Sequence, residues 1–335
     1  MQLYFHTDDP SIQESVDSFV AQWNSPDDFF QVKTSGSTGA PKTIHILKAH
    51  ARSSARMTGA FLGFYSGMNA LLCLSPDTIA CKMMIIRAME WNLNLHVTLP
   101  SANPFKDVTK TMEFVAMVPY QVQRSIKESP DAFHDRMQLI IGGGPISLPL
   151  EKQIQKLPCN AYHTFGMSET ISHIALRNIT KKSKRFRLLN GVSANIKDGK
   201  LQISAPHLGV DNLVTNDCVE FFGDRDFIWL GRLDFVVNSG GVKIHPEEVE
   251  KLLAPLFNAN FFVIGIPDEQ LGERLILCME SDPFPIKKQD LEAILPKYHV
   301  PGKVYFYSEF TYTKSDKINR LATIANEMRD EKSLL

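Results

Sequence analysis

A nine-residue segment near the N-terminus combines hydroxyl side chains, glycines and a lysine, which suits a polyphosphate. It consists of Thr34, Ser35, Gly36, Ser37, Thr38, Gly39, Ala40, Pro41 and Lys42. Glycines let backbone N–H groups approach phosphate oxygens, hydroxyls donate hydrogen bonds, and lysine adds a mobile positive charge. A Walker P-loop needs glycine before its lysine and then opens a helix, whereas Pro41 stands here and Thr43 predicts extended chain. The segment therefore favours ATP binding by another kind of loop, with a polar turn between strands as the alternative.

Four further motifs follow in order along the chain and supply candidate partners for that loop. They are Tyr162 to Thr170, Thr215 to Asp217, Gly231 to Ile244, and Lys317 to Arg320. Together with the first segment, this series resembles the adenylate-forming superfamily of acyl- and aryl-CoA synthetases, non-ribosomal adenylation domains and luciferases. Within that superfamily it is most similar to the o-succinylbenzoate–CoA ligases of menaquinone biosynthesis. The resemblance covers the chain from about residue 32 to residue 325.

The resemblance implies an acid–thiol ligase that uses ATP and Mg²⁺ and works through an acyl-AMP intermediate. Its expected substrates are a small carboxylic acid, with o-succinylbenzoate favoured, and coenzyme A (CoA). Three features depart from the family: only 33 residues precede Thr34, and Asn216 and Asp316 stand where relatives have glycine. Two alternatives therefore stay open, another acyl- or aryl-acid adenylating enzyme and a catalytically weak nucleotide-binding partner protein.

The resemblance assigns the reacting phosphates to residues of three motifs. Ser35, Ser37, Thr38 and Lys42 would face the β- and γ-phosphates. Glu169 stands at the position of the family's Mg²⁺ carboxylate, Ser168 replaces a threonine that contacts the α-phosphate, and Lys317 matches the lysine that bridges the attacking carboxylate and the α-phosphate. Because two anions must meet in this reaction, such contacts stabilise its transition state. We therefore expect Lys317, Glu169 and Ser168 to be catalytic.

The nucleoside of ATP has its own expected contacts. Gly142, Gly143 and Gly144 match the family's glycine-rich wall beside adenine, where backbone without side chains lies against the base. Phe165, followed by Gly166, corresponds to the aromatic residue on the other face of the base, unless it is an ordinary core phenylalanine. Asp217 and Arg232 match the pair that binds the ribose hydroxyls, since a carboxylate accepts from two hydroxyls and a guanidinium donates in a fixed fork.

The family rotates its C-terminal domain between two half-reactions, and Asp234 matches the hinge. In the second half-reaction the segment Asn238 to Lys243 would move in, so that Gly240 and Gly241 line the pantetheine tunnel. A bare Gly-Gly turn is the competing explanation for these glycines. The acyl group is expected next to Thr170, Ser172 and His173, because they directly follow Glu169. A second carboxylate on the acid needs a donor, and Ser172, His173 or Lys82 would provide one.

The composition excludes several other classes of protein. The chain has 335 residues, is 44% hydrophobic and carries a net charge of −1, so nucleic acid is not expected as its main partner. Lys181 to Arg187 is a locally basic run that suits a solvated loop or an anionic ligand such as CoA. Five cysteines without CxxC spacing predict a reduced, cytoplasmic protein, and the histidines show no transition-metal pattern.

The sequence does not indicate a membrane partner and leaves a homo-oligomer open. Its N-terminus lacks the pattern of a signal peptide. Met57 to Pro76 has no charged residue, but Ser66, Asn69 and its glycines favour a helix and a buried strand over a membrane span.

Alternating helical and strand-like patterns predict a layered α/β fold. Helices are expected over 49–62 and 82–91, and strands over 70–74, 96–98, 114–118 and 137–141. Short strands over 194–196, 200–204, 219–222 and 227–230 predict a small β-rich subdomain over about 191–233. After Asp234, helices over 246–253 and 288–294 and strands over 260–266 and 274–280 predict a mobile α+β domain. The expected domains are thus 1–233 for ATP and acid and 234–335 as the lid.

Overall fold

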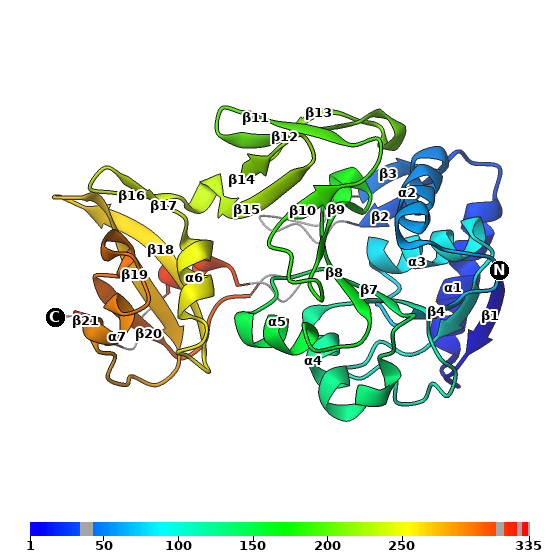
Figure 1. Cartoon of the computed structure of the whole chain (residues 1–335), viewed down its shortest axis with the longest axis horizontal. Coiled ribbons are helices and arrows are strands. Elements are labelled where there is room, and N and C mark those ends of the chain that lie inside the picture. Colours follow the sequence, from blue (N-terminus) through cyan, green and yellow to red (C-terminus); the bar gives the residue numbers. More distant parts are fainter. Residues whose placement is uncertain (34–42, 313–317, 327–329, 334–335) are drawn as a thin grey trace.

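A ten-stranded mixed sheet forms the larger part of the molecule (Figure 1). The computed structural model describes residues 1–33, 43–312, 318–326 and 330–333. In spatial order the strands are β1 (Gln2–Phe5), β5 (Asn94–Val97), β4 (Asn69–Leu72), β6 (Phe114–Met117), β7 (Gln138–Ile141), β8 (Asn160–Gly166), β9 (His173–Asn178), β10 (Phe186–Leu188), β15 (Asp226–Arg232) and β14 (Asp217–Phe222). From β1 to β8 neighbouring strands are parallel, and from β8 to β14 they are antiparallel.

Helices cover both faces of this sheet. Residues along β4 alternate between two hydrophobic clusters, because successive side chains of a strand point to opposite faces: Ala70 and Leu72 join one cluster, and Leu71 joins the other. The first cluster packs against α1 (Pro10–Asn24), α2 (Lys48–Leu62) and α3 (Ile79–Glu90). The second packs against α4 (Pro119–Glu128), the 3₁₀ helix η1 (Pro130–Ala132) and α5 (Leu148–Ile154). The layered α/β class predicted from the sequence is confirmed.

The strands of the expected β-rich subdomain divide between two sheets, and the subdomain as a unit stays a prediction. A separate three-stranded sheet consists of β11 (Ser193–Lys197), β12 (Lys200–Ala205) and β13 (Val210–Val214). The 3₁₀ helix η3 (Pro206–Leu208) connects β12 to β13. β14 and β15 instead extend the ten-stranded sheet through β10. An antiparallel hairpin can join the edge of either sheet, and its residue pattern is the same in both cases. The expectation therefore found the strands but not their partners.

The chain restarts after the 3₁₀ helix η4 (Leu233–Phe235) with its own sheet. Its elements are β16 (Val237–Ser239), β17 (Val242–Ile244), α6 (Pro246–Leu253), β18 (Asn260–Asp268), β19 (Gly272–Glu280), α7 (Lys288–Glu292), η5 (Lys297–His299), β20 (Lys303–Tyr307), α8 (Arg320–Ile324) and β21 (Asp330–Ser333). α6 begins at the expected residue, because Pro246 occupies its first position and two glutamates follow in its first turn. Two hydrophobic clusters of this sheet contain only residues after 236. This separation supports the predicted boundary at Asp234, which stays a prediction.

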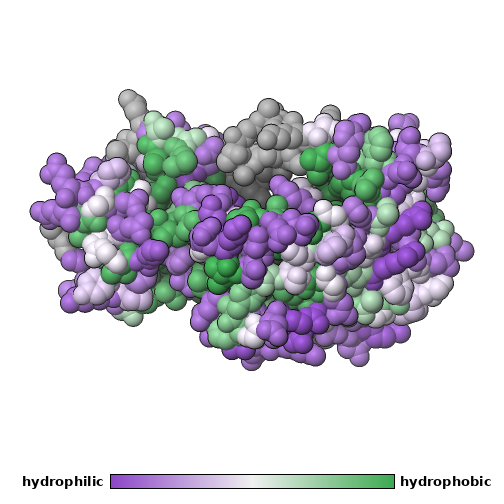
Figure 2. All heavy atoms as spheres, turned by 90° about the horizontal axis from the view of Figure 1, so that it is seen from above, coloured by the Kyte–Doolittle hydropathy of each residue, from purple (hydrophilic) through white to green (hydrophobic). Residues whose placement is uncertain are grey.

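The apolar stretch from Met57 to Pro76 forms the end of α2, a turn and the buried strand β4. Among the described residues no helix is long and apolar enough to cross a membrane. Figure 2 shows hydrophilic side chains over most of one face of the molecule, with hydrophobic patches scattered between them.

Candidate active site

The expected phosphate loop joins the two strands of a hairpin. β2 (Phe29–Lys33) and β3 (Thr43–Leu47) are antiparallel, and Lys33 pairs with Thr43 at their ends. Phe30 fixes the hairpin to α1, with its ring centroid 5.6 Å from that of Phe19. The extended chain expected at Thr43 is confirmed, which agrees with the absence of a Walker-type helix start. Thr34, Ser35, Gly36, Ser37, Thr38, Gly39 and Lys42 themselves lie outside the described residues, as do Asp316 and Lys317.

The glycine-rich segment and Phe165 come from neighbouring parallel strands. Gly142 follows β7, and Ile141 pairs with His163 on β8, so the carboxyl ends of the two strands meet at one edge of the sheet. A Cβ atom on Gly142 would lie only 2.4 Å from the Thr164 hydroxyl, and Gly143 has a φ of +83°. Both positions therefore require glycine for local packing or backbone geometry, whatever they bind.

Phe165 belongs to a cluster of aromatic rings. It is half-buried, with its ring centroid 5.2 Å from Phe227 and 5.7 Å from Phe186. The next residue, Gly166, would place a Cβ atom 2.3 Å from the backbone oxygen of Ser172. Glycine at this position lets the segment after Glu169 fold tightly back on β8. Phe165 thus has a structural role in the core, and its assignment to adenine stays a prediction.

The candidate metal residue is available for a ligand. Ser168 and Glu169 lie in the 3₁₀ helix η2 (Ser168–Thr170), which directly follows the end of β8. The Glu169 side chain is exposed and forms no ion pair with any described residue, while Ser168 is half-buried. A free carboxylate next to a hydroxyl is a donor set that suits Mg²⁺ with a phosphate oxygen.

The predicted ribose pair is brought together by the sheet. Asp217 and Arg232 are directly opposite each other on β14 and β15. Asp217 is buried and accepts a hydrogen bond of 2.8 Å from the indole nitrogen of Trp229. Arg232 instead donates from Nη2 to Oδ2 of the hinge residue Asp234, at 2.5 Å. The predicted ribose site and the predicted hinge would therefore share one guanidinium.

Gly240 and Gly241 form the tight turn between β16 and β17. Ser239 pairs with Val242, and the two glycines have φ values of +57° and +82°. A two-residue hairpin turn with positive φ at both positions strongly prefers glycine. The competing explanation, a Gly-Gly turn, thus accounts for both residues without a tunnel, and their contact with pantetheine stays a prediction.

The sequence reasoning missed a buried network beside the glycine-rich segment. The His163 ring hydrogen-bonds to the backbone of Gly144, and Arg177 Nη2 lies 3.5 Å from its Nδ1. Arg177 also forms a bidentate pair with Glu151 of α5, with both distances 2.9 Å. Burial, and then the charge of Arg177, lower the pKa of His163 to about 4, so the ring is neutral at neutral pH. This network holds the glycine-rich segment in place.

Arg87 is a second residue that the sequence reasoning missed. It lies on α3, is only 2% exposed, and donates from Nη2 to the Ser172 hydroxyl at 2.8 Å. Its Nε has no hydrogen-bond partner, and among the described residues no carboxylate pairs with it. Burial lowers the pKa of Arg87 to about 9, so it stays charged at neutral pH. An arginine inside the apolar run from Met83 to Met89 is the sequence signal that could have identified it.

A chain of hydrogen bonds continues from Arg87 into the core. Ser172 Oγ lies 3.4 Å from Nδ1 of His173, whose Nε2 lies 3.1 Å from the Thr58 hydroxyl. Thr58 donates to the backbone oxygen of Ser54, so His173 must donate from Nε2 and accept at Nδ1. Burial, and then the charge of Arg87, hold the pKa of His173 well below its usual value. The neutral His173 therefore orients Ser172, while Arg87 carries the only charge among these residues.

Of the residues expected to contact the acid, some belong to the hydrogen-bond network of Arg87 and others do not. Ser172 and His173 contribute to the Arg87 network. Thr170 is fully buried and its hydroxyl bonds to the backbone of Met167 and of Ser172, so its expected contact with the acyl group has no support from the geometry and stays a prediction. Lys82 donates to the backbone oxygen of Gln31 at 2.9 Å and makes no described hydrogen bond with Ser172. Arg87 is therefore a further candidate cation for the expected acid site, and the role of Lys82 stays a prediction.

Comparison with known proteins identifies the family. The solved structure of an acyl-CoA synthetase (AMP-forming)/AMP-acid ligase II-like protein from Dyadobacter fermentans is 33% identical to this chain, with a TM-score of 0.65. The match covers 96% of this chain and 95% of the other. The chain belongs to the adenylate-forming superfamily. No protein-family model matches the chain.

Longer relatives of this superfamily share part of their length with the chain. The 2-succinylbenzoate–CoA ligase of Haemophilus influenzae is 25% identical over 281 residues, which are 77% of this chain and 61% of that enzyme. The enzyme of the same name from Lactococcus lactis is 26% identical and matches over 86% of this chain and 69% of its own. The o-succinylbenzoate CoA synthetase MenE of Bacillus subtilis, solved with ATP and magnesium ion, has a TM-score of 0.75 at 20% identity, covering 88% of this chain and 69% of MenE. The chain thus spans roughly three fifths to two thirds of these relatives.

Proposed function

We propose that this chain is an ATP-dependent acid–CoA ligase that acts through an acyl-AMP intermediate, on an acid with a second carboxylate such as o-succinylbenzoate. One observation carries the choice of acid: Arg87 is a buried cation without a described carboxylate partner. Burying an unpaired charge is costly, so a site of this kind suits an anion that arrives with the substrate. Ser172, its hydrogen-bond partner, follows Glu169 by three residues, which puts the cation near the place where acid and ATP must meet.

The proposed ATP site combines the carboxyl ends of β7 and β8 with the Asp217–Arg232 pair of β14 and β15. Asp217 and Arg232 would hold the ribose hydroxyls, and Gly142 to Gly144 would lie against adenine. Glu169 would ligate Mg²⁺, which suits a carboxylate that is exposed and free of ion pairs among the described residues. The bound ion would neutralise part of the triphosphate charge. The neighbouring Ser168 hydroxyl would donate to the α-phosphate, and Lys317 would stabilise the charge that develops as the carboxylate attacks.

The proposed second half-reaction transfers the acyl group to CoA after rotation about Asp234. This scheme requires the division into 1–233 and 234–335, which the separate hydrophobic clusters support. The proposed partners are therefore the acid, ATP and CoA. All five cysteines are buried and unpaired, which favours a cytoplasmic location for this proposal.

Acid-dependent exchange of labelled pyrophosphate into ATP tests this function. The panel contains o-succinylbenzoate, 3-benzoylpropionate, which has the same side chain but no ring carboxylate, and benzoate. We expect exchange with o-succinylbenzoate and at least about 10-fold less with 3-benzoylpropionate, since a charged hydrogen bond is worth about 1.5–3 kcal/mol. Equal exchange with both acids would exclude the second carboxylate. No exchange with any acid would favour the nucleotide-binding partner protein.

A further inference from the structure

Glu247 of α6 contacts the strand that precedes the hinge. A Cβ atom on Gly231 would lie 2.4 Å from Glu247 Oε2, so this carboxylate packs directly against the Gly231 backbone, next to the N–H of Arg232 that attracts it. Gly231 has a φ of +142°. Both residues end β15, which belongs to the large sheet. The side chain of Glu247 therefore reaches from the C-terminal part of the chain onto the strand that carries the ribose residue Arg232.

Glu247 also lies next to a cluster of charged side chains within the C-terminal part, formed by Arg320 and Glu250. Arg320 Nη2 lies 3.7 Å from Glu247 Oε1 and 2.9 Å from Glu250 Oε2. The guanidinium carbon of Arg320 also lies 4.7 Å from the ring centroid of Phe235, which directly follows the hinge residue. The side chains of Arg320, Glu247 and Glu250 are 13%, 12% and 19% exposed, so this cluster is largely enclosed. Burial raises the pKa of Glu247, which agrees with this enclosure.

The packing of Glu247 against Gly231 and Arg232 thus crosses Asp234, whereas the ion pairs of Arg320 do not. The positive charge of Lys251, one turn later on the same helix, also attracts Glu151 of α5 across Asp234. Rotation about Asp234 would move α6 relative to β15, break the contact of Glu247 and weaken this attraction. They therefore stabilise one arrangement of the two parts of the chain.

That arrangement places the end of the C-terminal motif beside the ribose pair. Arg320, the last residue of the motif that begins at Lys317, is joined through Glu247 to Arg232, and Arg232 faces Asp217 across two strands. In a two-step ligase this proximity is needed while ATP reacts. We propose that Glu247 is a latch that holds the chain in its adenylating arrangement and is released when CoA reacts. The assignment to half-reactions rests on the proposed function, whereas the latch itself does not.

Distance measurements between two spin labels test the latch without any activity. Gln153→Cys on α5 and Gln289→Cys on α7 place labels on exposed positions of the two parts, and the native cysteines are all buried. In this background, Glu247→Ala is compared with Glu248→Ala, a neighbouring exposed glutamate of the same helix. We expect Glu247→Ala to shift the ratio of the two arrangements by about 10- to 100-fold, as for loss of one charged hydrogen bond, and to broaden the distance distribution. Glu248→Ala should match the parent.

The variant Glu247→Gln separates the contact with β15 from general structural damage. It keeps the size of the side chain and an oxygen that can face the Gly231 and Arg232 backbone, so its distances should stay close to those of the parent. Identical distances in Glu247→Ala and the parent would overturn the latch, as would loss of the parental distances in both Glu247→Ala and Glu248→Ala.

The two half-reactions then test what the latch does. Glu247→Ala should slow pyrophosphate exchange by about 10-fold or more while forming the thioester from supplied acyl-AMP at the parental rate or faster. Equal slowing of both half-reactions would contradict the assignment to adenylation. If the parent itself shows no exchange, the proposed function fails, while the distance measurements still decide whether the latch exists.

Discussion

Replacing Arg87 by methionine should improve the stability of the protein while weakening its use of a diacid. Methionine has a similar length but no charge, and it leaves Ser172 its second contact, with His173. Burial lowers the pKa of Arg87 to about 9, and a shift of this size corresponds to roughly 5 kcal/mol of lost hydration. Its hydrogen bonds, to Ser172 and weakly to the Met84 sulfur, return only about 1.5–3 kcal/mol of this cost. We therefore expect Arg87→Met to raise the free energy of unfolding by about 1–4 kcal/mol.

The same substitution removes the proposed partner of the second carboxylate. Loss of a charged hydrogen bond of about 1.5–3 kcal/mol predicts a KM for o-succinylbenzoate that rises by about 10- to 150-fold. The KM for ATP should change little, because Arg87 is not near the ribose pair in the proposed site. The variant should also treat o-succinylbenzoate and 3-benzoylpropionate alike, since the group that tells them apart is gone.

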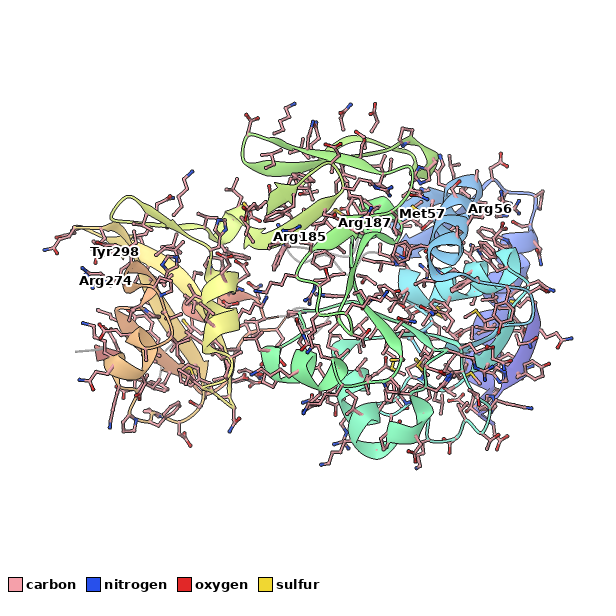
Figure 3. All side chains as sticks on the ribbon, viewed as in Figure 1. Arg56, Met57, Arg185, Arg187, Arg274 and Tyr298 are labelled. Atoms are coloured by element: carbon pink, nitrogen blue, oxygen red, sulfur yellow. The ribbon has the colours of Figure 1, made fainter. Side chains whose placement is uncertain are left out.

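Urea denaturation and pyrophosphate exchange measure these two effects on one preparation. Arg56→Met is the matched control, because Arg56 lies on the surface of α2 (Figure 3), 3.0 Å from Glu90, and its loss should leave both quantities nearly unchanged. A large fall in stability with an unchanged KM for the diacid would show that Arg87 is a structural residue. That result would refute the reasoning from its missing partner.

Three further outcomes follow from the site and the core. Asp217→Ala should weaken ATP binding by about 1–3 kcal/mol in nucleotide titrations and raise the KM for ATP accordingly, with little change in the KM for the acid. Unchanged ATP binding in a folded variant would remove the ribose assignment. Lys317→Ala should slow adenylation by at least about 10²-fold yet convert supplied acyl-AMP at near parental rate, and normal adenylation would exclude its role. Burial, and then His6, lower the pKa of His96 to about 4, so between pH 6.5 and 4 the unfolded chain binds a proton that the folded chain does not. His96 should therefore contribute a fall in stability of about 2 kcal/mol from pH 7 to pH 5 in urea melts, in addition to the falls from His163 and His173, and His96→Asn should reduce the dependence by that amount.

Local patterns predicted the elements of this fold where the cause of each element is local. The helix from Pro246 carries its own start signal, and the strand from Phe114 to Met117 is continuously apolar because it is buried on both faces. The partners of β14 and β15 were not predictable in this way, since pairing depends on which sheet edge is free. The N-terminal strand β1 was not predicted either, and it completes the sheet next to β5.

The site shows the same division between local and distant causes. Asp217 and Arg232 lie within motifs, so their resemblance to a known pair was enough to predict that they meet. Arg87 and His163 acquire their roles from burial by elements that are distant in the sequence. Arg87, for example, bonds to Ser172, which lies 85 positions further along the chain. A window of sequence shows neither the burial nor the missing carboxylate. Only the packed structure identifies a buried cation that has no carboxylate partner among the described residues.

Product analysis without CoA tests the central claim most directly. The purified chain is incubated with ATP, Mg²⁺ and o-succinylbenzoate, the products are resolved by mass spectrometry, and CoA is then added. Before CoA is added, we predict equal amounts of pyrophosphate and of o-succinylbenzoyl-AMP, with the acyl-AMP bound to the protein. After CoA is added, we predict that the acyl-AMP is converted to AMP and the CoA thioester. ATP that binds but stays intact with every acid, or that is cleaved to ADP and phosphate, would contradict the account.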